Sequence, residues 1–145
     1  MYKYSKSVAV IAISMLASGC ATDRVTNFEG NKITLNFINT GSAYTSSASI
    51  ETVEGTLMAR GEVLPFRSAV SRVWPASNYH VDLMLLQPDG SSEIRNEVRL
   101  IQTRGLRRGH KRYSRRTYAF ASKLSRPPAN GSEFQVKIHQ GSHDG

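Results

Sequence analysis

The eight residues His80–Gln87, with the sequence HVDLMLLQ, decide the fold class of this chain. Every second residue from Val81 to Leu85 is apolar, which is the two-residue period of a β-strand. Met84 and Leu86 make the other face apolar as well, and a short run that is apolar on both faces is typical of a strand inside a sheet. Pro88–Ser91 follows as a hairpin turn, because proline and glycine supply the dihedral angles that a turn requires.

The same period recurs in short segments along most of the chain, bounded by Gly, Pro, Ser and Asn. Further strands are expected at residues 32–37, 54–63, 93–103, 116–124 and 134–138. The Ser/Thr/Gly-rich segment 41–49 is expected to be a loop, and 127–132 a turn. No segment carries an apolar stripe over three helical turns. The sequence therefore predicts an all-β fold, a small antiparallel β-sandwich of six to seven strands, with a five-stranded barrel as the alternative.

Composition sets limits on the class of protein. The chain has 145 residues, of which 39% are hydrophobic and 21% charged, values typical of one globular domain. They exclude a collagen, a coiled coil, a highly charged disordered protein and a polytopic membrane protein. Only one cysteine is present, so an intrachain disulfide is excluded.

The N-terminus has the pattern of an export signal. Lys3 and Lys6 precede an apolar run of ten residues, Val8–Ala17, and small residues follow. A transmembrane helix needs about 20 apolar residues, so this run is too short to span a bilayer. A positive start, a short apolar middle and small residues before a cleavage point indicate a secretory signal peptide.

The end of this signal, LASGC at Leu16–Cys20, resembles the lipobox of bacterial lipoproteins, with Ala17 where leucine is commonest. The resemblance implies cleavage before Cys20, a thioether-linked diacylglycerol on Cys20 and, in many bacteria, a third acyl chain on its amine. Two or more chains anchor a protein stably to a membrane. Because Ala21 rather than aspartate follows the cysteine, the resemblance also implies an outer-membrane protein that faces the periplasm.

These features divide the chain into four parts: a signal peptide at 1–19, lipidated Cys20 with a polar tether at 20–30, a β-sandwich domain at 31–140, and a flexible tail at 141–145. The order of strands and turns in the domain looks like that of small immunoglobulin-like or transthyretin-like modules of envelope lipoproteins. Fold alone does not assign function.

Positive charge is concentrated in one segment. The formal net charge is +8, and residues 98–132 contain ten Lys or Arg and no acid. Seven of these basic residues lie close together: Arg104, Arg107, Arg108, Lys111, Arg112, Arg115 and Arg116. Like charges repel, and interleaved glycines disfavour a helix, so we expect an exposed, mobile basic loop.

Arginine dominates this loop and suits bidentate contact with phosphate or carboxylate groups. The candidate partners are anionic envelope components: lipopolysaccharide, anionic lipid headgroups, peptidoglycan or an acidic protein. A solvated basic face without a partner is the alternative. No nucleic-acid-binding motif accompanies the charge, so nucleic acid is not the expected partner.

Catalytic and metal-binding patterns are absent from the sequence. It has no Gly-x-Ser-x-Gly elbow and no phosphate-binding glycine loop, and lipid on Cys20 would block the only thiol. His80 and His139 could meet if the ends of their strands coincide, but no further Cys or carboxylate cluster accompanies them, so no metal site or other cofactor is expected.

The sequence therefore predicts a lipid-anchored, non-catalytic structural or interaction module of the cell envelope. A lipoprotein subunit that tethers a secretion or conjugation apparatus is the alternative function.

Overall fold

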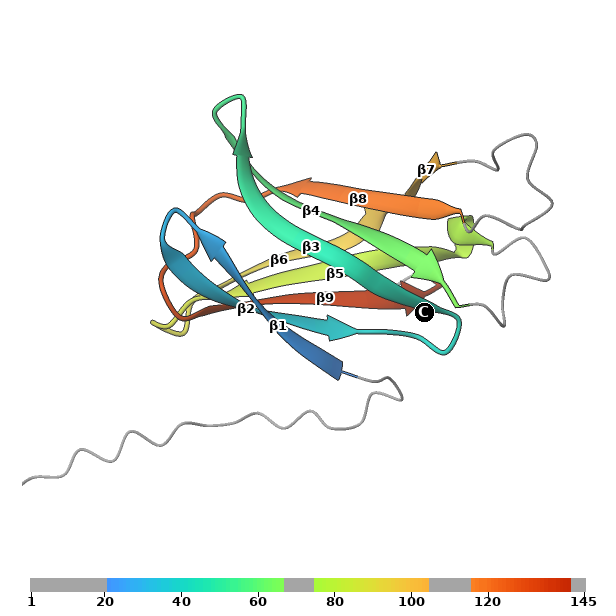
Figure 1. The fold of residues 1–145 in the computed structure, drawn as a ribbon, viewed down its shortest axis with the longest axis horizontal. Helices are drawn as coiled ribbons and strands as arrows, with labels where there is room; N and C mark the ends of the chain where they lie inside the picture. Colours follow the sequence, from blue (N-terminus) through green and yellow to red (C-terminus); the bar gives the residue numbers. More distant parts are fainter. Residues whose placement is uncertain (1–20, 67–74, 105–115, 142–145) are drawn as a thin grey trace, which may run out of the picture.

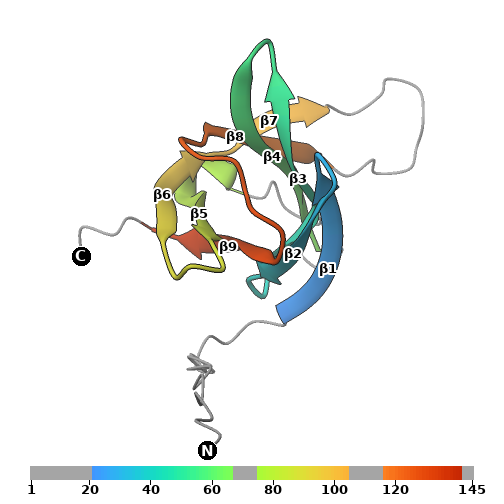
Figure 2. The same cartoon turned by 90° about the vertical axis from the view of Figure 1, so that its left-hand side faces the viewer.

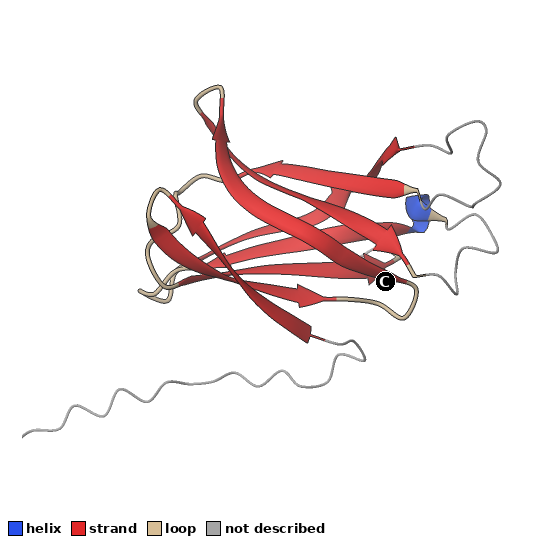
Figure 3. Cartoon of the chain, viewed as in Figure 1, coloured by secondary structure: helices blue, strands red, loops and turns tan. Residues whose placement is uncertain are grey.

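The computed structural model describes residues 21–66, 75–104 and 116–141. Strands occupy most of this part of the chain, and one short 3-10 helix at Ala76–Asn78 precedes the fifth strand (Figures 1 and 3). The strands are β1 Ala21–Phe28, β2 Asn31–Ile38, β3 Ala43–Val53, β4 Thr56–Pro65, β5 Tyr79–Leu86, β6 Ser92–Arg99, β7 Ile101–Arg104, β8 Thr117–Lys123 and β9 Ser132–Gln140.

The strands form two sheets that face each other across the core (Figure 2). One sheet has the order β1-β2-β9-β5-β6 and the other β3-β4-β8-β7. All neighbours are antiparallel except β2 and β9, which run parallel. The predicted β-sandwich is confirmed, and two separate sheets exclude the barrel. The described residues contain nine strands rather than the six to seven expected.

The strand at His80–Gln87 corresponds to β5, which lies between β9 and β6. Val81, Leu83 and Leu85 are almost completely buried, as their alternation predicted. On the neighbouring strand Phe134 and Val136 pair with Leu85 and Leu83 and are fully buried. The inward-facing residues of these two adjacent strands therefore form the part of the core that the centre of the larger sheet covers.

Gly61 lies at a close approach of three neighbouring strands, β3, β4 and β8, within the smaller sheet. It pairs with Phe120 across β4 and β8, and a Cβ atom at Gly61 would collide with the ring of Phe120 and with the backbone oxygen of Ser47. Because Ser47 contributes backbone rather than a movable side chain, no larger residue fits at position 61 without displacing β3. A register shift on β3 between Thr45 and Ser47 lies beside it.

The predicted tether at 20–30 is wrong for residues 21–28, which form β1 and pair with β2 along their whole length. Phe28 is buried, and the Arg24 guanidinium lies 5.5 Å from the centre of the Phe37 ring and donates a hydrogen bond to the Ser46 oxygen at 3.0 Å. A β-strand at a sheet edge needs few apolar residues, because backbone hydrogen bonds supply much of its pairing. That is why a polar sequence forms a strand here.

The predicted loop at 41–49 is also wrong, because β3 begins at Ala43. The inward-facing residues of β3 are small, so the sequence shows no clear alternation of apolar and polar residues there. Ala43 and Thr45 are buried, and Ala48 packs against the core after the register shift. The predicted strand at 93–103 is in fact two strands, β6 and β7, in different sheets. Leu100 is buried where the chain crosses between the sheets, and Ile101 then points outward with 64% of its surface exposed.

The two ends of the sandwich differ in what they carry. At one end β1, β3, β5 and β8 begin and the other strands finish, on the right-hand side of Figure 1. We call it the anchor end, because Cys20, the lipid attachment site that the sequence predicts, directly precedes β1. The opposite end, the far end, holds the hairpin turns. Glu29–Gly30 and Glu54–Gly55 have positive φ at both residues, the geometry of tight type I′ turns.

Candidate functional site

The sequence-predicted anchor, Cys20, lies outside the described residues but is covalently bonded to Ala21, the first residue of β1. Ala21 pairs with Ile38 at the end of β2. A residue in an extended chain spans only about 3.3 Å. Any group attached to Cys20 is therefore held next to the anchor end, without a spacer.

The basic segment begins and ends at the same end of the sandwich. Arg104 is the last residue of β7 and pairs with Thr117, the first residue of β8, and Arg116 precedes it. Arg116 is half-buried. The remaining predicted residues lie outside the described part of the chain: Arg107, Arg108, Lys111, Arg112 and Arg115. The sandwich thus brings both ends of the basic segment to the end where β1 begins, which sequence spacing could not predict.

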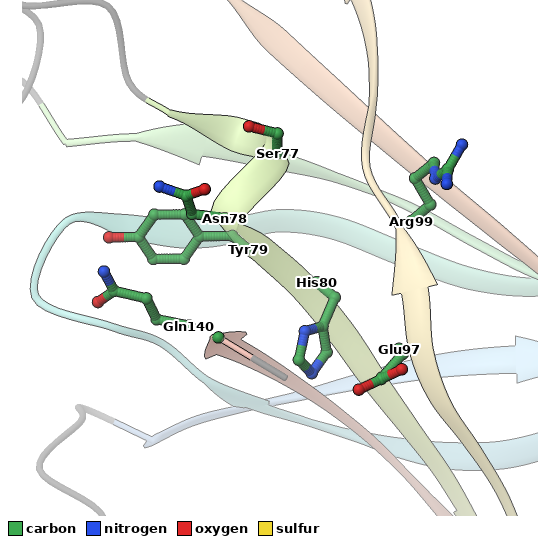
Figure 4. Close-up of a pocket in the computed structure, with 8 residues that line it drawn as sticks. Ser77, Asn78, Tyr79, His80, Glu97, Arg99 and Gln140 are labelled. Carbon is green, nitrogen blue, oxygen red and sulfur yellow. The ribbon is translucent and has the colours of Figure 1, made fainter. Parts of the chain in front are cut away.

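An open hollow of about 510 Å³ lies at the anchor end of the larger sheet (Figure 4). Its lining comes from four chain segments: the 3-10 turn, β5, β6 and the end of β9. Polar and charged side chains dominate, and they include Asn78, Tyr79, His80, Glu97, Arg99 and Gln140. Except for His80, these residues were not identified as a group from the sequence, because they lie far apart in the chain and have no motif spacing.

The two histidines singled out by the sequence do meet in this region. His80 pairs with His139 across β5 and β9, and their ring centres are 5.0 Å apart. His80 Nε2 lies 3.3 Å from Asp82 Oδ1. Of the residues that the structure describes, no three or more His, Cys, Asp or Glu are arranged to hold a metal ion.

Asp82 has a clear structural role beside the histidines. Its Oδ1 accepts a hydrogen bond of 3.0 Å from the backbone N–H of Glu97, and Glu97 has a left-handed φ of 56°. The pairing of β5 with β6 shifts register at this point. A residue added to one strand forms a β-bulge, so Asp82 holds the bulge of the edge strand β6 in place and sets the shape of the hollow.

At the far end, the side chain of Gln87 forms hydrogen bonds to the loop between β8 and β9. Its Oε1 accepts from the Ala129 N–H at 2.9 Å and the Ser132 hydroxyl at 2.8 Å, and its Nε2 donates to the Pro127 oxygen at 3.1 Å. These bonds join the β5–β6 turn to the β8–β9 loop. The side chain of Gln87 therefore holds two distant segments of the chain together at the far end.

The β5–β6 turn is stabilised by hydrogen bonds between Ser91 and Asp89. The hydroxyl and the backbone N–H of Ser91 donate to Asp89 Oδ1 at 2.5 and 2.8 Å. These two bonds hold the pKa of the Asp89 carboxyl below its ordinary value, with a smaller contribution from the charge of Arg126. The sequence identified Asp89 as a turn residue, and the structure confirms it.

Comparison with known proteins adds no relative: no family model, curated protein or solved structure matches this chain. The described residues contain no helix that is both long and apolar enough to cross a membrane.

Proposed function

We propose that this protein is a lipid-anchored, non-catalytic interaction module of the cell envelope, held at the outer membrane by lipid on Cys20, whose basic segment binds anionic envelope components. One observation carries the proposal. The first residue of β1 lies at the same end of the sandwich as the two ends of the basic segment, Arg104 at the end of β7 and Arg116 just before β8. Anchor and basic charge therefore act on the same side of the domain.

Two further features support a binding module. The β-sandwich core is continuous and apolar, and the far-end turns are fastened by side-chain hydrogen bonds. A rigid scaffold that carries a charged loop is a common arrangement for recognition. Arginine-rich segments bind phosphate and carboxylate groups through paired hydrogen bonds.

Replacing Cys20 by serine tests the anchor. The Cys20→Ser protein is expected to lose incorporation of a fatty-acid analogue and to leave the membrane fraction, because a hydroxyl cannot form the thioether that carries two acyl chains. Metabolic labelling followed by membrane fractionation measures both. Ser18→Ala is the matched control and should keep label and location. Undiminished membrane association of Cys20→Ser would contradict the proposal.

Neutralising the basic segment tests the partner chemistry. Replacing Arg107, Arg108, Arg112 and Arg115 by glutamine is expected to weaken binding to lipopolysaccharide and to anionic vesicles, at about 1 kcal/mol for each charge removed. Thermal stability should stay nearly constant, since solvated charges contribute little to it. Wild-type binding should fall as salt rises, because surface charges are screened. Binding that is changed neither by the substitutions nor by the salt concentration would contradict an anion-binding role.

A further inference from the structure

We propose that the anchor end is itself a membrane-facing surface that contacts anionic lipid headgroups, so that the domain stands on the bilayer with its far end pointing away. This inference rests on the proposed function, because it takes the lipid on Cys20 as given. It adds an orientation, a set of described residues that touch the membrane, and a choice of lipid headgroups among the possible anionic partners.

The absence of a spacer fixes which end meets the membrane. A tether of ten residues would let the domain rotate freely, whereas β1 begins at the residue after Cys20 and is paired from Ala21 onward. Acyl chains on Cys20 enter the bilayer, so the backbone at Ala21 and its partner Ile38 must lie at the level of the headgroups. The β2–β3 connection, which follows Ile38, lies at the same end.

An aromatic pair lies beside this connection. The Phe66 N–H donates to the Ser42 oxygen at 2.8 Å, and the Phe66 and Tyr44 rings have centres 4.9 Å apart. Phe66 keeps 36% of its surface exposed. Tyrosine and tryptophan gather at the membrane–water interface, where an apolar ring and a polar group are both accommodated, and an exposed Phe beside Tyr44 provides the apolar part of such a contact.

Arginines at the same end match an anionic surface. Arg99 ends β6 and is exposed, and Arg116 precedes β8. Glu97 also lies here, at the hollow, while Asp82 is occupied by the Glu97 N–H and by His80. The aromatic and cationic part of the contact surface consists of Phe66, Tyr44, Arg99 and Arg116, and Glu97 is an exposed acid beside Arg99.

The far end carries acids at the tips of its turns, and the cations Lys32 and Arg126 lie at the same end. Each of its three tight hairpin turns carries an acid, at Glu29, Glu54 and Asp89. β6 alone spans about 23 Å from one end to the other at roughly 3.3 Å per residue, well beyond the Debye length of about 8 Å at physiological salt. The acids therefore do not weaken the attraction at the anchor end.

Fluorescence quenching in vesicles measures this orientation. The full-length gene is expressed so that the cell lipidates Cys20, and the purified protein is reconstituted into vesicles with anionic lipid and headgroup spin labels. Because the chain has one cysteine and lipid occupies it, an introduced cysteine is the only free thiol. Gln140→Cys, exposed at the anchor end, and Ser92→Cys, exposed at the far end, each carry the fluorophore.

The probe at position 140 should be quenched several-fold more than the probe at 92. Combining Arg99→Gln with Arg116→Gln should reduce that difference, and should lower the affinity of the unlipidated Cys20→Ser protein for anionic vesicles about fivefold for each arginine removed. The matched control combines Lys32→Gln with Arg126→Gln, two cations at the far end, and should change neither value.

The outcomes separate the inference from the function on which it rests. Protein that carries no lipid and fails to float with the vesicles contradicts the proposed function. Protein that is anchored but shows equal quenching at both positions overturns the orientation alone. A quenching difference that is the same in neutral vesicles and insensitive to Arg99 and Arg116 overturns the headgroup contact.

Discussion

Replacing Phe134 by alanine is expected to lower the free energy of unfolding by about 3–5 kcal/mol, the usual cost of removing a buried aromatic ring. Phe134 is fully buried on β9, between its register partners Leu35 on β2 and Leu85 on β5. The lost ring leaves a cavity where three strands meet, and neighbouring strands hold the walls apart. Domains of this size are stable by only about 5–15 kcal/mol, so the loss is a large share of the total.

Urea denaturation followed by circular dichroism measures the change. Ile94→Ala is the matched control, because Ile94 lies on β6 of the same sheet with 53% of its surface exposed; its cost should be within about 0.5 kcal/mol. A Phe134→Ala protein as stable as the control would mean that the inward and outward faces of the sheet are exchanged.

Removing β1 is expected to destabilise the domain strongly. Joining Cys20 directly to Glu29 deletes the residues between them, including Phe28, whose burial alone contributes about 1.5–3 kcal/mol. It also exposes the edge of β2 and removes Arg24 from the Phe37 ring. The melting temperature, measured by circular dichroism, should fall by well over 10 °C.

A pair of point substitutions in β1 separates the loss of the strand from the shortening of the chain. Phe28 is 7% exposed and Val25 is 68% exposed on the same strand. Phe28→Ser should therefore destabilise the domain, whereas Val25→Ser should leave it nearly unchanged. Equal, negligible effects of both substitutions and of the deletion would restore the interpretation of 20–30 as a tether.

The large apolar residues made most of the fold predictable from the sequence. The alternation in β5 and β9 identified both strands and their inward faces, because each second residue is Val, Leu, Ile or Phe. β1 and β3 were missed for a shared reason. On the face of β1 that carries the buried Phe28, the two preceding positions hold Arg24, which is exposed, and Thr26, which is partly buried. The first buried positions of β3 hold Ala43 and Thr45. Small or polar residues give no hydrophobic period although the backbone ladder forms.

The candidate site was less predictable than the fold. Sequence spacing suggested that His80 and His139 could meet, and they do. It could not place Glu97 or Arg99 beside them, because a bulge in β6 shifts the register there. Nor could it place Arg104 and Arg116, the two ends of the basic segment, at the anchor end, since that depends on β6 and β7 belonging to different sheets.

The central claim, a lipid at the first residue before β1, is tested most directly by mass spectrometry of the protein purified from membranes. The account predicts a mature chain that begins at Cys20, with the added mass of a diacylglyceryl group on the N-terminal peptide and, in a bacterium that adds it, of one further acyl chain. A chain that begins elsewhere, or that begins at Cys20 with a free thiol, would contradict it.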